Sequence, residues 1–330
     1  MRIRMSTAAV IGAGGIGRFH LEKLLLLLRE KDCPYSTVAF SRTSDAGVKN
    51  TLDDLLPVFP EASLKGYSDH RRLVIEENPS YVVVATPTEC HSSVVQDLLL
   101  DCKNLHSILV EKPSSNILPM SEWMAQSLSH VNYGVNLQMA CLHLRNVEKS
   151  IQTYPYTLQD RILDSDHISF VWHSVPKNKS GQGVLFDLGV HCLSLLPGKM
   201  TGNYKLLEAH DTPSGVKFDV CFFDAVKATF RLEYKMDSAD CQRTVHMEDS
   251  AGREWGFSFS HKKSGSFGVI PVISCNLYGE HVSTVEYCQD LSMISMRNIF
   301  LKGSPVVSGK DELQYLRIIS DVAKHLNKRS

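Results

Sequence analysis

A glycine-rich turn near the amino terminus constrains the fold of this chain more than any other feature. The segment Gly12-Ala13-Gly14-Gly15-Ile16-Gly17 has the pattern G-x-G-x-x-G, with a short apolar run at 8–11 before it and a helical pattern at 16–30 after it. In this setting the first glycine permits a tight turn, the second lets the backbone approach a pyrophosphate, and the third lets helix and strand pack closely. The segment therefore predicts a parallel α/β domain that binds a dinucleotide.

The start of the predicted helix completes the expected phosphate site. Its first N–H groups have no partner within the helix, and the positive end of the helix dipole lies there. A glycine-rich turn can also serve packing alone, but a protein-kinase loop is excluded because no H-R-D or D-F-G segment follows. We expect the cofactor to contact Gly12, Gly14, Gly15, Ile16 and Gly17.

Short apolar runs alternate with helical stretches as far as residue 118. The runs at 38–40, 81–85 and 108–110 are apolar enough to be buried on both faces, and 92–101 is typical of a crossover helix. Such alternation predicts a parallel sheet covered on both sides by helices. We therefore expect residues 1–118 to form an NAD(P)-binding Rossmann domain with a doubly wound parallel sheet.

After Pro119 the pattern changes to longer runs in which apolar and polar residues alternate. Such runs are typical of half-buried strands in an antiparallel or mixed sheet. The fold class we expect is therefore α/β, with residues 119–330 forming a C-terminal α+β domain on an open, mostly antiparallel sheet. The predicted elements are a helix at 121–129, strands near 131–137 and at 167–173, 216–223, 226–234, 244–247 and 255–259, and a terminal helix at 310–327.

Composition excludes several classes of protein. The 330 residues are 43% hydrophobic and carry a formal net charge of −1, so a disordered chain and a basic nucleic-acid binder are both excluded. The run Leu24–Leu28 is bracketed by charged residues and is far shorter than the roughly 20 apolar residues of a membrane span, so it predicts a buried helix face. The nine cysteines include no C-x-x-C pair, which favours a reducing, cytoplasmic location over secretion.

The end of the second predicted strand bears on which dinucleotide is bound. An NAD enzyme usually places an acid there for the ribose 2′-OH, but the chain has Phe40-Ser41-Arg42-Thr43 and no acid before Asp45. Ser41 and Thr43 can donate to a 2′-phosphate, and Arg42 can pair with it and stack on the adenine. An ordinary surface arginine is the alternative, but we expect NADP rather than NAD.

Three further segments, in order along the chain, carry a resemblance to a known family. They are Ala85-Thr86-Pro87-Thr88-Glu89-Cys90-His91, Glu111-Lys112-Pro113 and Asp187-Leu188-Gly189-Val190-His191. Together with the glycine fingerprint, they make residues 7–200 resemble the glucose–fructose oxidoreductase, inositol dehydrogenase and MocA-like (Gfo/Idh/MocA) oxidoreductase family. The resemblance implies that Thr86, Pro87 and His91 lie in a loop under the nicotinamide ribose, with Glu111 and Lys112 beside the cofactor.

The same resemblance implies which residues carry the chemistry. Hydride transfer at a secondary alcohol or ketone needs a group that exchanges the hydroxyl proton and a donor for the developing alkoxide. By resemblance, His191 exchanges the proton, Asp187 orients its imidazole, and Lys112 hydrogen-bonds the substrate oxygen. Glu111 would then support the backbone or the ammonium of Lys112, and Pro113 would fix the strand exit, through a cis peptide if one is present.

Each of these residues also has a simpler interpretation. Asp187 and His191 could be a surface pair on a helix that begins there, with Asp187 as its cap, and Lys112 could be a solvated charge. No further ligands stand at metal-site spacing, so we expect no metal. Gln138 and Ser194 depart from the family pattern at positions that face its substrate pocket, which leaves a non-sugar substrate open.

The expected activity is therefore NADP-dependent oxidation or reduction of a secondary alcohol or ketone on a sugar, cyclitol or nucleotide sugar. An imine-type reductase and a non-catalytic NADP-binding regulator on the same fold stay open, and an NAD-dependent glycosidase is a weaker alternative. The expected partners are a small-molecule substrate and further copies of the chain in a homodimer or homotetramer, with neither nucleic acid nor membrane. Oligomerisation is expected because an open sheet would otherwise leave an apolar face in water.

Overall fold

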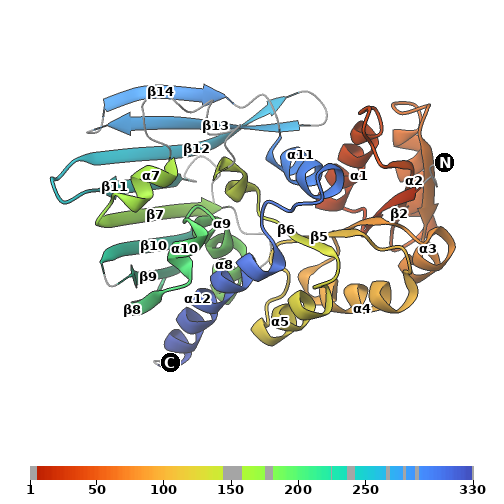
Figure 1. The fold of residues 1–330 in the computed structure, drawn as a ribbon. Helices are drawn as coiled ribbons and strands as arrows, with labels where there is room; N and C mark the ends of the chain where they lie inside the picture. Colours follow the sequence, from red (N-terminus) through yellow and green to blue (C-terminus); the bar gives the residue numbers. More distant parts are fainter. Residues whose placement is uncertain are drawn as a thin grey trace. The chain divides into compact units, whose positions relative to one another are not determined.

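The computed structural model describes residues 6–143, 158–174, 181–223, 225–235, 242–264, 268–277, 280–286 and 290–328. The chain divides into two compact units, each made of two stretches of sequence. Unit 1 consists of Met1–Asn136 and Ser292–Lys310, and unit 2 of Leu137–Leu291 and Asp311–Ser330. Each unit contains one sheet, as Figure 1 shows.

Unit 1 is a parallel sheet of six strands in the order β3-β2-β1-β4-β5-β6, the strand order of a dinucleotide-binding Rossmann fold. Its elements are β1 (Ser6–Ile11), α1 (Ile16–Leu27), β2 (Tyr35–Ser41), α2 (Asp45–Leu55), β3 (Ser63–Tyr67), α3 (His70–Glu77), β4 (Tyr81–Val84), the 3₁₀ turn η1 (Thr88–Cys90), α4 (His91–Asp101), β5 (Ser107–Glu111), α5 (Leu118–Ser127), β6 (Asn132–Asn136), and the returning α11 (Leu291–Met296) and π-helical η5 (Arg297–Leu301). The order reverses between β1 and β4, so the loops that follow these two strands emerge side by side at one edge.

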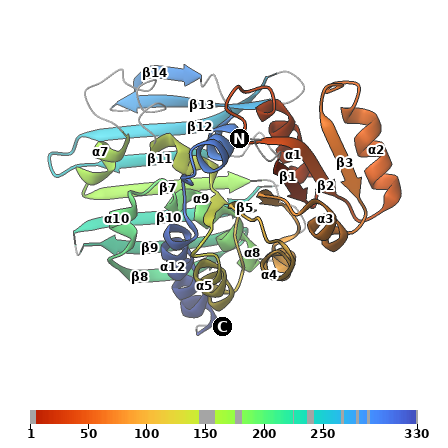
Figure 2. The same ribbon diagram turned by 45° about the vertical axis from the view of Figure 1, so that its right-hand side comes forward.

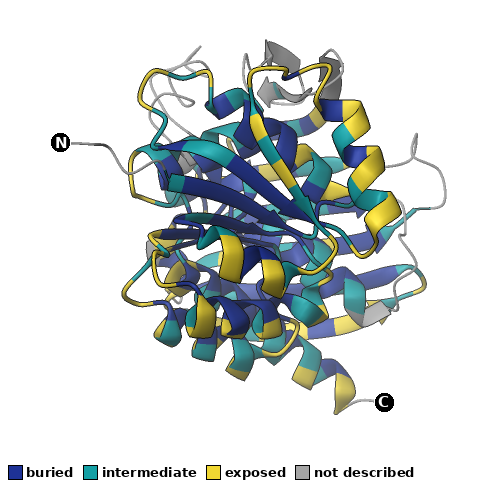
Figure 3. Cartoon of the chain, turned by 90° about the vertical axis from the view of Figure 1, so that its right-hand side faces the viewer, coloured by how far each residue is buried: buried dark blue, intermediate teal, exposed yellow. Residues whose placement is uncertain are grey.

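Buried strands between two layers of helices explain the continuous apolar runs of the sequence. Figures 1 and 2 place α3, α4 and α5 together on one face of the sheet, and α1 lies on the other face. Figure 3 shows the buried strands between helices whose outer sides are exposed. Fully buried residues such as Val10, Val83 and Leu109 follow from coverage on both faces. The fold class predicted from the sequence is therefore confirmed.

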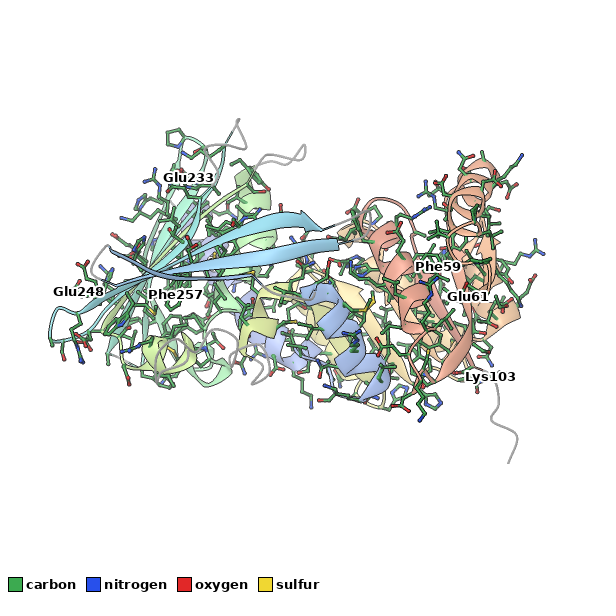
Figure 4. The ribbon with its side chains drawn as sticks, turned by 90° about the horizontal axis from the view of Figure 1, so that it is seen from above. Phe59, Glu61, Lys103, Glu233, Glu248 and Phe257 are labelled. Carbon is green, nitrogen blue, oxygen red and sulfur yellow. The ribbon has the colours of Figure 1, made fainter. Side chains whose placement is uncertain are left out.

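Three leucines of the run at 24–28 lie on the buried side of α1, which the sequence predicted as a buried helix face. Leu21, Leu24, Leu25 and Leu27 are at most 1% exposed and share a core with residues of α2 and of η5. The helix ends at Leu27, three residues earlier than the pattern suggested. Beyond it, the Arg29 guanidinium lies over the Phe59 ring and pairs with Glu61, and Figure 4 labels both of these residues.

Unit 1 extends beyond residue 118, where the sequence placed the domain boundary. β6 pairs in parallel with β5 over five residues, and α5 packs on α4, so both elements belong to the Rossmann sheet. The returning segment 292–310 adds Met296, Ile299 and Phe300 to the core beside α1. Unit 1 is therefore longer than the predicted domain of residues 1–118, and it is made of two separate stretches of the chain.

Unit 2 contains an eight-stranded mixed sheet in the order β14-β13-β12-β11-β7-β10-β9-β8, in which only β7 and β10 run parallel within the described residues. Its elements are η2 (Gln138–His143), α7 (Leu158–Leu163), β7 (His167–Ser174), α8 (Gly181–Val184), the π-helical η3 (Leu185–Gly189), α9 (Val190–Leu193), α10 (Gly198–Thr201), β8 (Tyr204–Thr212), β9 (Gly215–Phe222), β10 (Val226–Tyr234), β11 (Arg243–Glu248), β12 (Glu254–Ser264), β13 (Gly268–Leu277), β14 (Glu280–Glu286) and α12 (Gly309–Asn327). This is the open, mostly antiparallel sheet that the sequence predicted.

The two faces of this sheet differ in chemistry over strands β7, β9, β10 and β11. The face under the helices carries the stacked rings Phe218, Phe230 and Phe170, with centroids 4.7 Å apart in each pair. The other face carries ion pairs, including Lys227 with Asp219 at 2.8 Å and Arg231 with Glu233 at 2.9 Å. The large apolar face that motivated the oligomer expectation is therefore not found on these four strands, and the oligomeric state stays a prediction.

Within the described ranges, no helix combines the length and the apolar character that crossing a membrane requires.

Candidate active site

The glycine fingerprint forms a turn in which two of its glycines cannot be replaced without a clash. Gly12 has a φ of +88°, and a Cβ there would lie 2.9 Å from the backbone nitrogen of Thr86. A Cβ on Gly17 would lie 2.0 Å from the carbonyl oxygen of Gly12, so only glycine lets α1 pack this closely on the loop. The predicted roles of these glycines in the turn and in helix packing are thus visible in the backbone.

The amino-terminal end of α1 is open in the way that a phosphate site requires. Gly15 stands at the cap position with a φ of +44° and no side-chain cap, and nothing lies within 4 Å of where its Cβ would be. The first turn contains no acidic residue, and Ile16 is exposed. A helix start without a side-chain cap and the open space at Gly15 fit the pyrophosphate of a dinucleotide.

The residues after β2 lie against this turn. The Ser41 side chain is buried, and its Oγ accepts a hydrogen bond from the Gly12 N–H at 3.2 Å. Arg42 crosses over the turn, because its Nη1 donates to the carbonyl oxygen of Ala13 at 2.6 Å. Thr43 is exposed, and Asp45, two residues later, lies in the first turn of α2. Ser41 thus supports the glycine turn, while Arg42 and Thr43 are available to a ligand at the end of β2.

The loop after β4 is fixed by a buried histidine. His91 is the first residue of α4, and its Nε2 lies 2.9 Å from the carbonyl oxygen of Thr86. Its Nδ1 lies 3.2 Å from the carbonyl oxygens of both Pro113 and Ser114. Burial lowers the pKa of His91 below its usual value, although these carbonyl groups oppose the shift. His91 therefore joins the β4 loop to the segment after β5.

Thr86 and Pro87 lie at the rim of this loop. Pro87 is exposed, and Thr86 is half-buried with its Oγ1 shielded from solvent. Within the described residues, that oxygen has no hydrogen-bond partner. A polar atom in this state, next to the glycine turn, fits a site that a ligand completes.

Glu111 and Lys112 lie at the carboxyl end of β5, at the same edge of the sheet. The Glu111 carboxylate is buried and lies 2.5 Å from His20 Nε2, 2.6 Å from Asn136 Nδ2 and 3.2 Å from the backbone nitrogen of Lys112. Burial alone would raise the pKa of Glu111, but the hydrogen bonds and charges of His20, Asn136 and Lys112 lower it to about 2. Lys112 is half-buried, and its peptide bond to Pro113 is cis.

In unit 2, Asp187 and His191 lie on one helical run that extends from Gly181 to Leu193. The expectation that a helix begins at Asp187 is therefore wrong, because one helical turn precedes it and excludes a capping role. Asp187 falls in the π-helical turn η3, and π-helical turns are frequent at functional sites. This local widening was not visible in the sequence.

Two aromatic residues of unit 2 flank this pair. The Tyr234 hydroxyl donates to Asp187 Oδ2 at 3.4 Å, and burial with the charge of Asp187 raises the pKa of Tyr234 well above its usual value. The Trp172 ring lies nearly parallel to the His191 ring, at 17°, with centroids 6.4 Å apart. Sequence reasoning missed both residues, since each lies on a strand far from the D-x-G-x-H segment.

Ser194 and Gln138, the two positions that depart from the family pattern, differ in whether their side chains are available to a substrate. Ser194 is 1% exposed, and its Oγ donates to the carbonyl oxygen of His191 at 2.8 Å, so its hydroxyl serves the helix end. Gln138 is half-buried at the start of η2. Only Gln138 therefore remains a candidate for selecting a substrate.

Part of unit 1 is similar to a known family of enzymes. Residues 6–131 match a family model described as the oxidoreductase family with an NAD-binding Rossmann fold (GFO_IDH_MocA). Residues 6–131 therefore form the NAD(P)-binding Rossmann fold of the Gfo/Idh/MocA oxidoreductase family. This confirms the resemblance drawn from the motifs, and the assignment as an enzyme. No curated protein sequence matches the chain.

Solved structures share the fold over nearly the full length of this oxidoreductase. KijD10, a 3-ketoreductase from Actinomadura kijaniata in complex with NADP and TDP-benzene, superposes with a TM-score of 0.70 at 14% identity over 98% of each chain. The aldose-aldose oxidoreductase from Caulobacter crescentus gives 0.70 at 15% identity over 99% of each chain. The UDP-N-acetylglucosamine 3-dehydrogenase GnnA from Acidithiobacillus ferrooxidans gives 0.68 at 12% identity over 98% of each chain.

The part of the chain that the structure describes contains no group of three or more His, Cys, Asp or Glu side chains arranged to hold a metal ion.

Proposed function

We propose that this oxidoreductase transfers hydride between NADP(H) and a secondary alcohol or ketone of a sugar, cyclitol or nucleotide sugar. The observation that carries the proposal is the edge of the unit 1 sheet, where the uncapped start of α1, Arg42 and Lys112 lie at the ends of β1, β2 and β5. Ligands of open α/β sheets bind at this carboxyl edge, at the point where the strand order reverses.

The choice of NADP rests on the end of β2. Arg42 holds its guanidinium over the glycine turn, and the next residue is the exposed Thr43. A guanidinium and a hydroxyl suit the dianionic 2′-phosphate of NADP, whereas NAD recognition usually uses an acid at this place. The structure of KijD10, which has a similar fold, was solved in complex with NADP, and this agrees with the choice of NADP here.

The proposed chemistry follows the family resemblance, which assigns roles to Lys112, Asp187 and His191. The nicotinamide, when bound, supplies or accepts the hydride at the carbon of the substrate. Lys112 donates a hydrogen bond to the substrate oxygen, and His191 gives or takes its proton, with Asp187 orienting the imidazole. The sugar-type substrate is supported by GnnA, a UDP-N-acetylglucosamine 3-dehydrogenase, and by the aldose-aldose oxidoreductase. KijD10 is a 3-ketoreductase, which agrees with reduction of a ketone.

The cofactor assignment is tested by titrating the full chain with NADPH and with NADH, following the quenching of protein fluorescence. Arg42→Ala should weaken NADPH binding by about tenfold or more, the value of a lost charge-assisted contact, and change NADH binding little. Arg72→Ala is the matched control, since Arg72 is an exposed arginine that pairs with Glu76 on the same helix. Equal NADPH affinity of Arg42→Ala and Arg72→Ala would refute the assignment.

The reaction is tested with a panel of nucleotide sugars, inositols, keto-sugars and cyclic imines, following NADPH absorbance. We expect turnover on a carbonyl or carbinol member, and a fall in kcat of about 100-fold or more in Lys112→Met and His191→Asn with NADPH affinity retained. Turnover on imines alone would favour the imine reductase. Tight NADPH binding with no absorbance change on any member would favour the non-catalytic regulator.

A further inference from the structure

The buried carboxylate of the residue before Lys112 accepts hydrogen bonds from two other elements and from the backbone of Lys112 itself. Glu111 is the last residue of β5, and its side chain is 10% exposed. Its Oε1 accepts hydrogen bonds from His20 Nε2 of α1 and from Asn136 Nδ2 at the end of β6. Its Oε2 accepts one from the backbone N–H of Lys112. No step of the proposed reaction uses His20 or Asn136.

His20 ties the cofactor-binding helix to this carboxylate. It lies three residues after Gly17, so it is one turn into the helix whose amino-terminal end forms the phosphate site. A carboxylate oxygen only accepts, so the proton of the contact lies on His20 Nε2. The imidazole is completely buried, and its only partner among the described residues is Glu111, because Nδ1 has none there.

The second oxygen of Glu111 acts on the backbone of Lys112. Two donors at Oε1 hold the carboxylate group of Glu111 in one orientation. Its Oε2 then accepts the hydrogen bond from the Lys112 N–H at one position. Because this N–H is directly at the end of β5, fixing it also fixes where the lysine side chain starts. A buried carboxylate needs several donors, and here they come from α1 and β6, so both elements determine how the carboxylate is held.

We propose that His20 and Asn136 are positioning residues, which clamp Glu111 so that its carboxylate directs Lys112 toward the substrate oxygen. The inference rests on the proposed function for the role of Lys112, but the clamp itself is a feature of unit 1. It also makes the orientation of Lys112 depend on α1, the helix that receives the cofactor phosphates. Hydride-transfer geometry is sensitive to such support, because displacement of a reacting group by about 1 Å can lower a rate about 100-fold.

The clamp predicts how substitutions behave. His20→Leu leaves the buried carboxylate with one donor fewer at Oε1, and Asn136→Leu does the same from the other side. His20→Gln is the conservative variant, since its amide nitrogen can donate from nearly the same place as Nε2. Leu24→Ala is the matched control, because Leu24 is buried on the same helix and belongs to the apolar core rather than to the clamp.

The first measurement needs no substrate. Each lysine of the full chain is labelled with acetic anhydride between pH 6 and 10, and the rate at Lys112 is divided by that at the exposed Lys103, which Figure 4 labels. We expect His20→Leu and Asn136→Leu to change this ratio by about threefold or more, with His20→Gln close to wild type. Leu24→Ala should lower the unfolding temperature and leave the ratio unchanged.

The second measurement uses the substrate found in the NADPH panel. The clamp predicts a kcat lowered about 10- to 100-fold in His20→Leu and Asn136→Leu, with KM and NADPH affinity changed less than threefold and with kcat recovered in His20→Gln. The inference would be overturned if the labelling ratio and kcat changed in proportion to the loss of unfolding temperature, and equally so in Leu24→Ala and His20→Leu. That outcome would leave the proposed function standing. If the wild-type chain turns over no member of the panel, the proposed function fails, and the labelling ratio alone decides the clamp. If His20→Leu does not fold, Asn136→Leu and His20→Gln carry the same comparison.

Discussion

At the scale of single residues, Glu111 makes stability depend on pH in a defined direction. Its pKa of about 2 lies below the usual value of 4.5, since hydrogen bonds and neighbouring charges outweigh burial. A carboxyl group with a lowered pKa in the folded state stabilises the protein fully above its unfolded pKa. That stabilisation is lost as the pH falls from about 4.5 toward 2, because the unfolded chain then binds the proton more readily.

The variant Glu111→Gln isolates this effect. We expect it to be less stable than the wild type at pH 7 by about 3 kcal/mol, the order of magnitude of the lost linkage. The difference in free energy of unfolding should shrink between pH 5 and pH 3, where the wild type loses the contribution and the variant has none to lose. Urea unfolding between pH 3 and pH 7 measures this difference in free energy. Glu254→Gln is the control, because Glu254 is exposed. A difference that stays constant with pH would contradict the assigned pKa.

The residues around Glu111 also mark how far sequence reasoning reaches at this scale. Glu111 and Lys112 were identified from a motif, because E-K-P is contiguous in the chain. His20 was not, since it is 91 residues from Glu111 and nothing in the helix pattern of α1 indicates a buried partner. Tyr234 and Trp172 were missed for the same reason, because their contacts with Asp187 and His191 arise only from strand register. Contacts between distant segments depend on packing that periodicity does not encode.

At the scale of elements, His91 connects two loops through the first turn of α4. Its ring touches carbonyl oxygens of Thr86 on one side and of Pro113 and Ser114 on the other, and the residue is 1% exposed. His91→Leu removes these contacts, including the one N–H that a neutral imidazole can donate to the surrounding carbonyl oxygens. We expect a loss of about 2–3 kcal/mol of stability and faster hydrogen exchange at 86–90 and 114–117.

A histidine at the same place in the neighbouring helix provides the control. His70 is the first residue of α3, but its contact with Asp97 is half-exposed, so His70→Leu should cost about 1 kcal/mol or less. Hydrogen exchange followed by mass spectrometry and thermal unfolding compare the two variants. If both variants loosen segment 86–90 equally, or neither does, His91 is not the connector of these loops.

The elements themselves were predictable where burial imposes a pattern. The central strands β1, β4 and β5 were placed within two residues, because strands buried on both faces are continuously apolar. The strands β3, β8, β13 and β14 were missed. Three of them, β3, β8 and β14, lie at sheet edges, and much of the sequence of β3 and β8 is exposed. An edge strand has one neighbour and solvent on its other side, so its composition resembles that of a loop.

At the scale of the whole molecule, the chain builds unit 1 from two stretches that lie far apart in sequence. The sequence pattern indicated a change near Pro119, where apolar runs give way to alternating ones, but no local signal reveals that 292–310 returns to the first sheet. The returning segment contributes core residues beside α1, and the Arg297 guanidinium pairs with Glu30 at 2.6 Å. The Ser308 backbone also bridges to Gly134 of β6. Stability of the dinucleotide-binding unit therefore depends on residues near the end of the chain.

Phe300→Ala tests this dependence. Phe300 is 3% exposed in the core with Leu24 and Leu25, so its truncation should cost about 3–5 kcal/mol. Because the cavity opens beside α1, we expect faster hydrogen exchange in β1 and α1 and weaker NADPH binding, while the inner strands β7 and β10 stay protected. Leu207→Ala on β8 is the control, because this leucine is 43% exposed and its loss should cost less than about 1 kcal/mol. Exchange that rises first in β7 and β10 would instead assign the returning segment to unit 2, and the discontinuous composition of unit 1 would be wrong.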